Sequence, residues 1–249
     1  NHLELNTDAL PKHSEQLTIK GLKGIIPGKT KRSATQVNVE HTPVSDLKAF
    51  YNVMDAQQMD LGKNNSYIAG ESGFAFLKNP QNIKKYEYTG PAKNIAELLK
   101  TCPNLEYLFV EFPEDKPEFY EGLSGYKNSK LKSLQLNNYK GDSASLQTVL
   151  EQAPNLEHLE LRDCTGIRDF PKVSLNKLKI LELYTCDVQT MSGLNVPQIR
   201  AFKINFCDDF GSEALETITQ WKTLKYLWLE HISKEMETYP TAIANLTLD

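Results

Sequence analysis

The sequence predicts an α/β fold built from repeats, in which each repeat adds one strand to a parallel sheet. Three observations predict it. One apolar phrase recurs along the chain, its copies are evenly spaced, and most segments between copies have the periodicity of short helices. A repeat of 21 to 26 residues cannot bury its apolar face alone, so neighbouring repeats must stack to complete a shared core.

The recurring phrase has an apolar residue, two variable residues, a second apolar residue, one variable residue and a third apolar residue. It occurs six times in succession, as NLEYLFV, KLKSLQL, NLEHLEL, KLKILEL, QIRAFKI and TLKYLWL. The first apolar residues are spaced 26, 25, 22, 21 and 25 apart. The last two apolar positions are separated by one residue and point to the same side of a strand. We therefore expect Leu159 and Leu161 to face the core and Glu160 to face outward.

The segments between the phrases return the chain to the start of the next strand. Three of them place apolar residues on one helical face, around residues 94–103, 144–154 and 212–221. Ser212 is the expected N-cap of the third helix. The segments DFPKVSLN and TMSGLNV are shorter, so we expect 3-10 turns or irregular structure there.

Cysteine occupies the ninth position of three successive repeats, at Cys164, Cys186 and Cys207. With repeats of this length, the sequence resembles the leucine-rich-repeat family, and within it the cysteine-containing, ribonuclease-inhibitor-like branch. KTCPNLEYL places Cys-Pro-Asn just before a strand, which resembles F-box-type repeats. The resemblance implies a curved horseshoe solenoid, with a parallel sheet on the concave face and helices or 3-10 turns on the convex face. It does not specify a function, because this superfamily has many.

The repeats extend over the whole chain, which we expect to be a single domain of residues 1–249. Residues 81–249 hold the regular repeats, whereas residues 1–80 hold degenerate copies such as Val37 with Val39. Solenoids need polar capping repeats at their ends, and neither end of the sequence has one. We therefore expect the chain to be part of a longer protein.

Composition and charge narrow the classes of function. The chain is 40% hydrophobic and 24% charged, which is typical of a folded protein. Its formal net charge of -4 disfavours a nucleic-acid partner. No apolar run is long enough to span a bilayer, so we expect no membrane association. The four cysteines form no C-x-x-C pair. Stacked reduced thiols favour a cytoplasmic location, although a secreted protein is the alternative.

Two groups of residues could suggest chemistry, and we expect neither to perform it. The three stacked cysteines could suggest a soft-metal site. They lie just past the strands, where repeats of this kind use Cys or Asn to form hydrogen bonds with the loop backbone. We therefore expect a structural role for them. His158, Asp163 and Cys164 belong to one repeat, but His158 should face outward and Cys164 the core. The sequence also lacks the G-x-S-x-G, P-loop, G-x-G-x-x-G and H-E-x-x-H motifs. We expect no enzyme activity, no catalytic residue, no metal and no cofactor.

The outward strand positions carry the expected function, which is binding of a protein partner. Exposed aromatic residues flanked by carboxylates have the composition of an interface core with a polar rim. The acidic bias predicts a partner surface that is basic or mixed. A competing interpretation is that stacked aromatic rings only cover the sheet. The expected partner-binding residues are Tyr107, Phe109, Glu111, His158, Glu160, Arg162, Ile180, Glu182, Tyr184, Tyr226, Trp228 and Glu230.

Two further hypotheses address the wider protein. The chain could be the substrate-recognition part of a ubiquitin-ligase-type receptor, whose F-box would lie outside it. It could instead be the targeting half of a bacterial effector, whose catalytic domain would lie outside it. The frequent Lys, Asn and Gln residues and the loosely matching repeats suit a bacterial origin.

Overall fold

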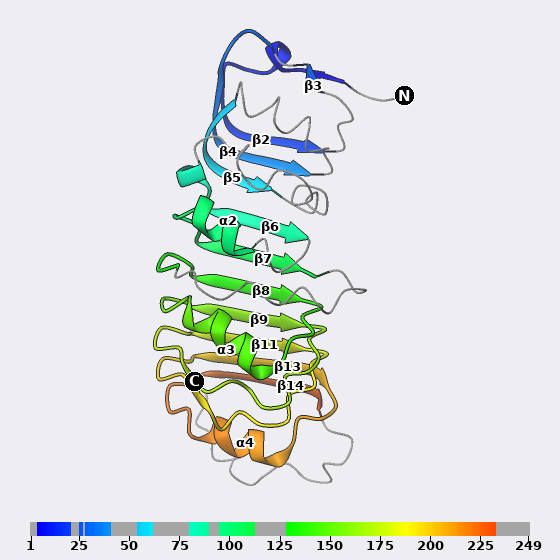
Figure 1. Cartoon of the computed structure of the whole chain (residues 1–249), viewed down its shortest axis with the longest axis vertical. Coiled ribbons are helices and arrows are strands. Elements are labelled where there is room, and N and C mark those ends of the chain that lie inside the picture. The colour runs from blue at the N-terminus through cyan, green and yellow to red at the C-terminus, as the bar shows by residue number, and fades with distance from the viewer. Residues whose placement is uncertain are drawn as a thin grey trace.

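A parallel sheet of seven strands is the largest element of the structure. The computed structural model describes residues 4–20, 25–26, 28–40, 54–61, 80–89, 95–112 and 128–232. The sheet contains, in order, β6 (Lys85–Thr89), β7 (Tyr107–Glu111), β8 (Ser133–Asn137), β9 (His158–Arg162), β11 (Ile180–Tyr184), β13 (Ala201–Cys207) and β14 (Tyr226–Ile232). Strands of successive repeats are therefore neighbours in the sheet (Figure 1). This is the α/β repeat arrangement that the sequence predicts.

The strands align without offset, so equivalent residues of successive repeats lie side by side. Leu159 of β9 is paired with Leu134 of β8 and with Leu181 of β11. Leu161, two residues later, belongs to a second column of this kind. Both Leu159 and Leu161 are completely buried. The two columns form the core, as the alternation of apolar and polar residues predicts.

Three returns between strands are helical, as predicted. They are α2 (Ile95–Thr101), α3 (Ser143–Glu151) and α4 (Ser212–Thr219). Asp142 caps α3 by accepting a 2.8 Å hydrogen bond from the backbone N–H of Ser145. In α4 the N-cap is Gly211, so the prediction that Ser212 is the N-cap is wrong by one residue. None of the helices in the described ranges is long and apolar enough to cross a membrane.

The two short returns are non-helical and mostly irregular, as expected, but the expectation did not include strands. Each contains a two-residue strand, and β10 (Val173–Ser174) pairs in parallel with β12 (Leu194–Asn195). Extended chain advances about 3.3 Å per residue, compared with 1.5 Å in a helix. A repeat of 21 or 22 residues can therefore recross the fold only if its return is extended. Val173 and Leu194 turn their side chains into the core.

A second parallel sheet precedes the first along the chain. It contains β2 (His13–Lys20), β4 (Arg32–Glu40) and β5 (Met54–Leu61). Val37 of β4 is paired with Leu17 of β2 and Met59 of β5. β5 lies beside β6, where the two sheets meet (Figure 1). The remaining described elements are β1 (Leu5–Asn6), η1 (Thr7–Ala9), β3 (Ile25–Ile26) and η3 (Pro80–Asn82).

Candidate functional site

The side of the seven-stranded sheet that points away from the core carries three columns of side chains. We name this surface, from β7 to β14, the outer sheet face. Its first column is Tyr107, Ser133, His158, Ile180, Ala201 and Tyr226. Its second column is Phe109, Gln135, Glu160, Glu182, Lys203 and Trp228. Its third column is Glu111, Asn137, Arg162, Tyr184, Asn205 and Glu230. All the predicted partner-binding residues lie in these columns, and binding by them stays a prediction.

The C-terminal end of the outer sheet face is apolar and exposed. Tyr226 and Trp228, both on β14, are 65% and 57% exposed. With Ile180 and Lys203, their rings border a shallow hollow of about 440 Å³. Large aromatic side chains left in water at one place are a mark of binding surfaces, because their burial against a partner is favourable.

The exposed rings at this end are held by contacts with neighbouring side chains. The ammonium group of Lys203 lies 5.2 Å from the ring centroid of Tyr184 and 5.4 Å from that of Trp228. Tyr184 is the main reason that the pKa of Lys203 is raised. The indole N–H of Trp228 donates a 3.1 Å hydrogen bond to Glu230 Oε2, which also accepts one of 3.0 Å from Asn205. These contacts fix the orientation of the indole before any partner arrives.

A polar cluster occupies the centre of the outer sheet face. His158 Nδ1 lies 3.2 Å from the hydroxyl oxygen of Ser133, and His158 Nε2 lies 3.5 Å from Glu182 Oε2. Arg162 donates two hydrogen bonds, of 2.8 and 3.2 Å, to Glu160 Oε1. Three possible metal-ligand atoms, one from each of His158, Glu160 and Glu182, lie within 4.8 Å of one another. The cluster therefore gathers two carboxylates and one imidazole.

The cysteines lie in the core and bond to the backbone. Cys164 donates hydrogen bonds to the carbonyls of Leu136 and Arg162, at 3.5 and 3.2 Å. Cys186 contacts two carbonyls in the same way. This confirms that Cys164 faces the core while His158 faces outward, so the two cannot act as nucleophile and base. Contacts among the thiols, together with burial, raise the pKa of Cys186 and Cys207, which keeps both protonated.

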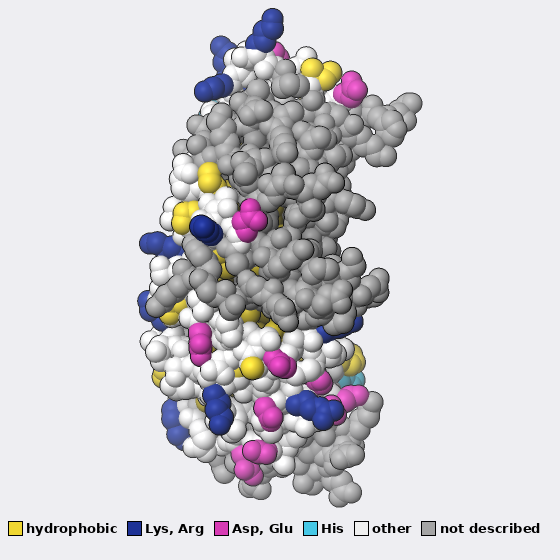
Figure 2. Space-filling model, viewed as in Figure 1, with side chains coloured by type: hydrophobic (Ala, Val, Ile, Leu, Met, Phe, Trp, Pro, Cys, Tyr) yellow, Lys and Arg dark blue, Asp and Glu magenta, His cyan; other side chains and the backbone are white. Residues whose placement is uncertain are grey.

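A second surface follows the edge of the sheet at which the strands begin. Glu106 contacts Lys132 at 2.6 Å and Lys84 at 3.1 Å, and Glu157 contacts Lys179 at 2.6 Å. Hydrogen bonds from Lys132 and Lys84 lower the pKa of Glu106. Lys and Arg side chains along this edge are visible in Figure 2. Because lysine and glutamate alternate across repeats, the ion pairs neutralise much of the charge and link successive repeats.

Sequence reasoning missed several residues of the outer sheet face. Lys203 and Ser133 belong to repeats whose outward positions had not been included among the expected binding residues. Aligning the six phrases would have placed both residues beside the predicted ones. Phe206 of β13 and His231 of β14 were also missed. Their own φ angles are positive, at 54° and 47°, and their rings stack with centroids 4.5 Å apart. Both residues occupy the eighth position of their repeats, just before the cysteine position, so extending the alignment past the apolar phrase would have placed them side by side.

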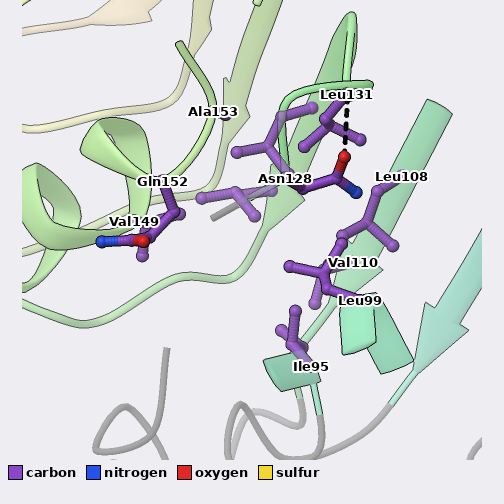
Figure 3. A pocket seen from close by; sticks show the side chains of 11 residues that line it. Ile95, Leu99, Leu108, Val110, Asn128, Leu131, Val149, Gln152 and Ala153 are labelled. Atoms are coloured by element: carbon purple, nitrogen blue, oxygen red, sulfur yellow. Dashed lines mark hydrogen bonds between the residues drawn. The ribbon is translucent and has the colours of Figure 1, made fainter. Parts of the chain in front are cut away.

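An apolar pocket also lies between the sheet and the helices. Figure 3 shows Leu108, Val110, Ile95 and Leu99 on one side of it and Val149 on the other. Its cavity volume is about 20 Å³, which is about the space of one water molecule. A gap of this size and lining is a feature of core packing, and it has no room for a ligand.

Each repeat adds one strand to the seven-stranded sheet, with apolar residues at fixed positions and a polar and aromatic outer face. These features define an α/β repeat protein. A family model described as At1g61320/AtMIF1, LRR domain, matches residues 122–248. Since this is just over half of the chain, the chain belongs to the leucine-rich-repeat family. Domains of this family generally mediate protein–protein interaction and are typically non-catalytic. No curated protein matches the sequence.

Proposed function

We propose that the chain is a non-enzymatic protein-binding module that docks a protein partner on the outer sheet face. The observation that carries the proposal is the exposure of Tyr226 and Trp228 beside the hollow at the C-terminal end. Residues of this kind supply much of the binding energy at protein interfaces, because they bury large rings at little cost in side-chain entropy. The contacts of Lys203 and Glu230 with the indole hold it ready for binding.

The charges of the outer sheet face define the partner further. Its four glutamates are Glu111, Glu160, Glu182 and Glu230. The face has two cations. Arg162 contacts Glu160 and the ring of Tyr184, and Lys203 contacts the rings of Tyr184 and Trp228. The remaining acidic surplus suits a partner surface that is basic or mixed, with an apolar residue that enters the hollow.

Several finer features belong to the same proposal. The outer sheet face would be the concave side of a curved horseshoe solenoid that includes residues 1–249 as one domain. The bonds from the stacked cysteines to backbone carbonyls support the cysteine-containing, F-box-type branch. Four free, buried thiols support a reducing compartment such as the cytoplasm.

A comparative pull-down followed by affinity measurement tests the proposed function. The wild-type chain and a Tyr226→Ala, Trp228→Ala variant are used as baits, and each candidate partner is purified and titrated. Ile26→Ala, which truncates an exposed apolar side chain on β3, outside the seven-stranded sheet, is the matched control. We expect the double variant to bind at least about tenfold more weakly, with an unchanged circular dichroism spectrum. A partner that binds both variants as tightly as the wild type contradicts the proposed site.

A further inference from the structure

The polar cluster at the centre of the outer sheet face combines features that partner docking does not explain. His158, Glu160 and Glu182 come from the neighbouring strands β9 and β11, and each contributes one ligand atom to a group within 4.8 Å. Each of the three side chains is half-buried. All three ligand atoms are therefore held by the rigid sheet rather than by loops.

The imidazole of His158 is oriented toward the carboxylates. The contact between Ser133 and Nδ1, at 3.2 Å, engages one ring nitrogen. The other nitrogen, Nε2, is shielded from solvent and makes no hydrogen bond within the described structure. A group that fixes one nitrogen of a histidine and leaves the other available is the usual support of a metal-binding histidine.

The distance between His158 and Glu182 fits two ligands of one ion better than a direct bond. Nε2 and Glu182 Oε2 are 3.5 Å apart, beyond the usual hydrogen-bond distance of about 2.7–3.2 Å. Bonds of about 2.0–2.2 Å to a tetrahedral zinc ion separate two ligands by about 3.4 Å. The observed separation therefore leaves room for a cation between the two atoms.

The two glutamates of the cluster need a positive charge between them. Glu160 and Glu182 lie directly opposite each other on β9 and β11, and like charges at such positions repel. Of the two glutamates, Arg162 contacts only Glu160, and both of its hydrogen bonds end on Oε1. Lys203 lies opposite Glu182 in the register, but among the described residues it forms no ion pair with it. Glu182 and the second oxygen of Glu160 remain as carboxylate donors for a cation.

We propose that His158, Glu160 and Glu182 bind one divalent metal ion of the zinc class. Three protein ligands, one nitrogen and two oxygens, leave a fourth position open on the outer sheet face. Ser133 orients the histidine, and Arg162 orients Glu160. The ligands all come from this chain, so metal binding does not depend on a protein partner. Cys186 and Cys207 cannot compete, because contact with a neighbouring thiol and burial raise the pKa of both, and each thiol is bonded to a backbone carbonyl.

Isothermal titration calorimetry with zinc chloride on the full chain, free of any histidine tag, tests the proposal. We expect one saturable site in the wild type and at least about tenfold weaker binding in both His158→Ala and Glu182→Gln. Two variants are matched controls and should bind as the wild type does. They are His231→Ala, which removes a histidine outside the cluster, and Glu111→Gln, which removes a glutamate elsewhere on the same face.

Circular dichroism keeps the titration interpretable, because each variant must show the wild-type spectrum. Glu182→Gln is the decisive variant, since it preserves side-chain size and removes only charge. A wild-type chain without a saturable site overturns the proposal. Saturable binding that His158→Ala and Glu182→Gln leave unchanged, or that His231→Ala removes equally, also overturns it.

Discussion

Lys203 lies directly opposite Trp228 in the register of β13 and β14, and its ammonium group is 5.4 Å from the centroid of the indole ring. The same ammonium group is 5.2 Å from the ring of Tyr184, so one cation joins two aromatic residues from the repeats on either side of its own. The attraction between a cation and the face of an aromatic ring favours this arrangement. The aromatic end of the outer sheet face is therefore organised across three strands, and no single repeat could form it.

The two tryptophans should respond differently to a quencher in solution. Trp221 is buried and packs edge-on against Phe202, whereas Trp228 is 57% exposed. We expect acrylamide to quench mainly Trp228, because the quencher must collide with the ring. Fluorescence of Trp221→Phe should be strongly quenched and that of Trp228→Phe weakly quenched. Equal quenching of both variants would show that the indole of Trp228 is covered.

Removing a leucine from the inward column should destabilise the whole stack. Leu159→Ala truncates a completely buried side chain that lies between two other repeats. We expect a loss of about 2–5 kcal/mol in the free energy of unfolding, because the cavity adds to the lost burial. Urea denaturation followed by circular dichroism measures it. Ile180→Ala, on the outer sheet face, should cost about 1 kcal/mol or less, and a similar loss in both would refute the assignment of faces.

The core could be predicted from the sequence because apolar and variable residues alternate along each strand. Two apolar residues separated by one must share a side of a strand, and six aligned phrases place equivalent leucines together. The centre of the outer sheet face could not be predicted to the same depth. Phrase alignment puts Glu160 beside Glu182, but only the side-chain conformations bring a ring nitrogen of His158 within 4.8 Å of an oxygen from each carboxylate. The extended short returns were missed because β10 and β12 gain stability only by pairing with each other.

The four thiols should be unreactive while the protein is folded. Cys102, Cys164, Cys186 and Cys207 are all buried, and burial raises the pKa of Cys102 to about 12. Because the thiolate is the reactive form, a protonated and shielded thiol is doubly protected. We expect a disulfide reagent at about pH 8 to label almost no cysteine in the native chain and all four after unfolding. Rapid labelling of the native protein would contradict the buried stacking.

The ion pairs along the edge at which the strands begin should make stability depend on pH. Lys132 and Lys84 hold the pKa of Glu106 below its ordinary value. A carboxyl group with a depressed folded pKa contributes stability above its unfolded pKa, about 4.3. That contribution is lost as the pH falls through the lower folded pKa. Since the contacts are partly exposed, the effect should be modest and weaker in high salt.

Comparison of the wild type with Glu106→Gln isolates this contribution from the many other groups that titrate in acid. The variant should be less stable at about pH 7, and the difference should shrink as the pH falls through the lowered folded pKa of Glu106. Urea denaturation at a series of pH values measures the difference. Glu216→Gln is the control, because it removes an exposed glutamate of α4 that forms no ion pair within the described part of the chain. It should leave the stability unchanged at each pH. A difference for Glu106→Gln that persists unchanged in acid would mean that the lysine contacts contribute nothing, and that the variant acts through packing alone.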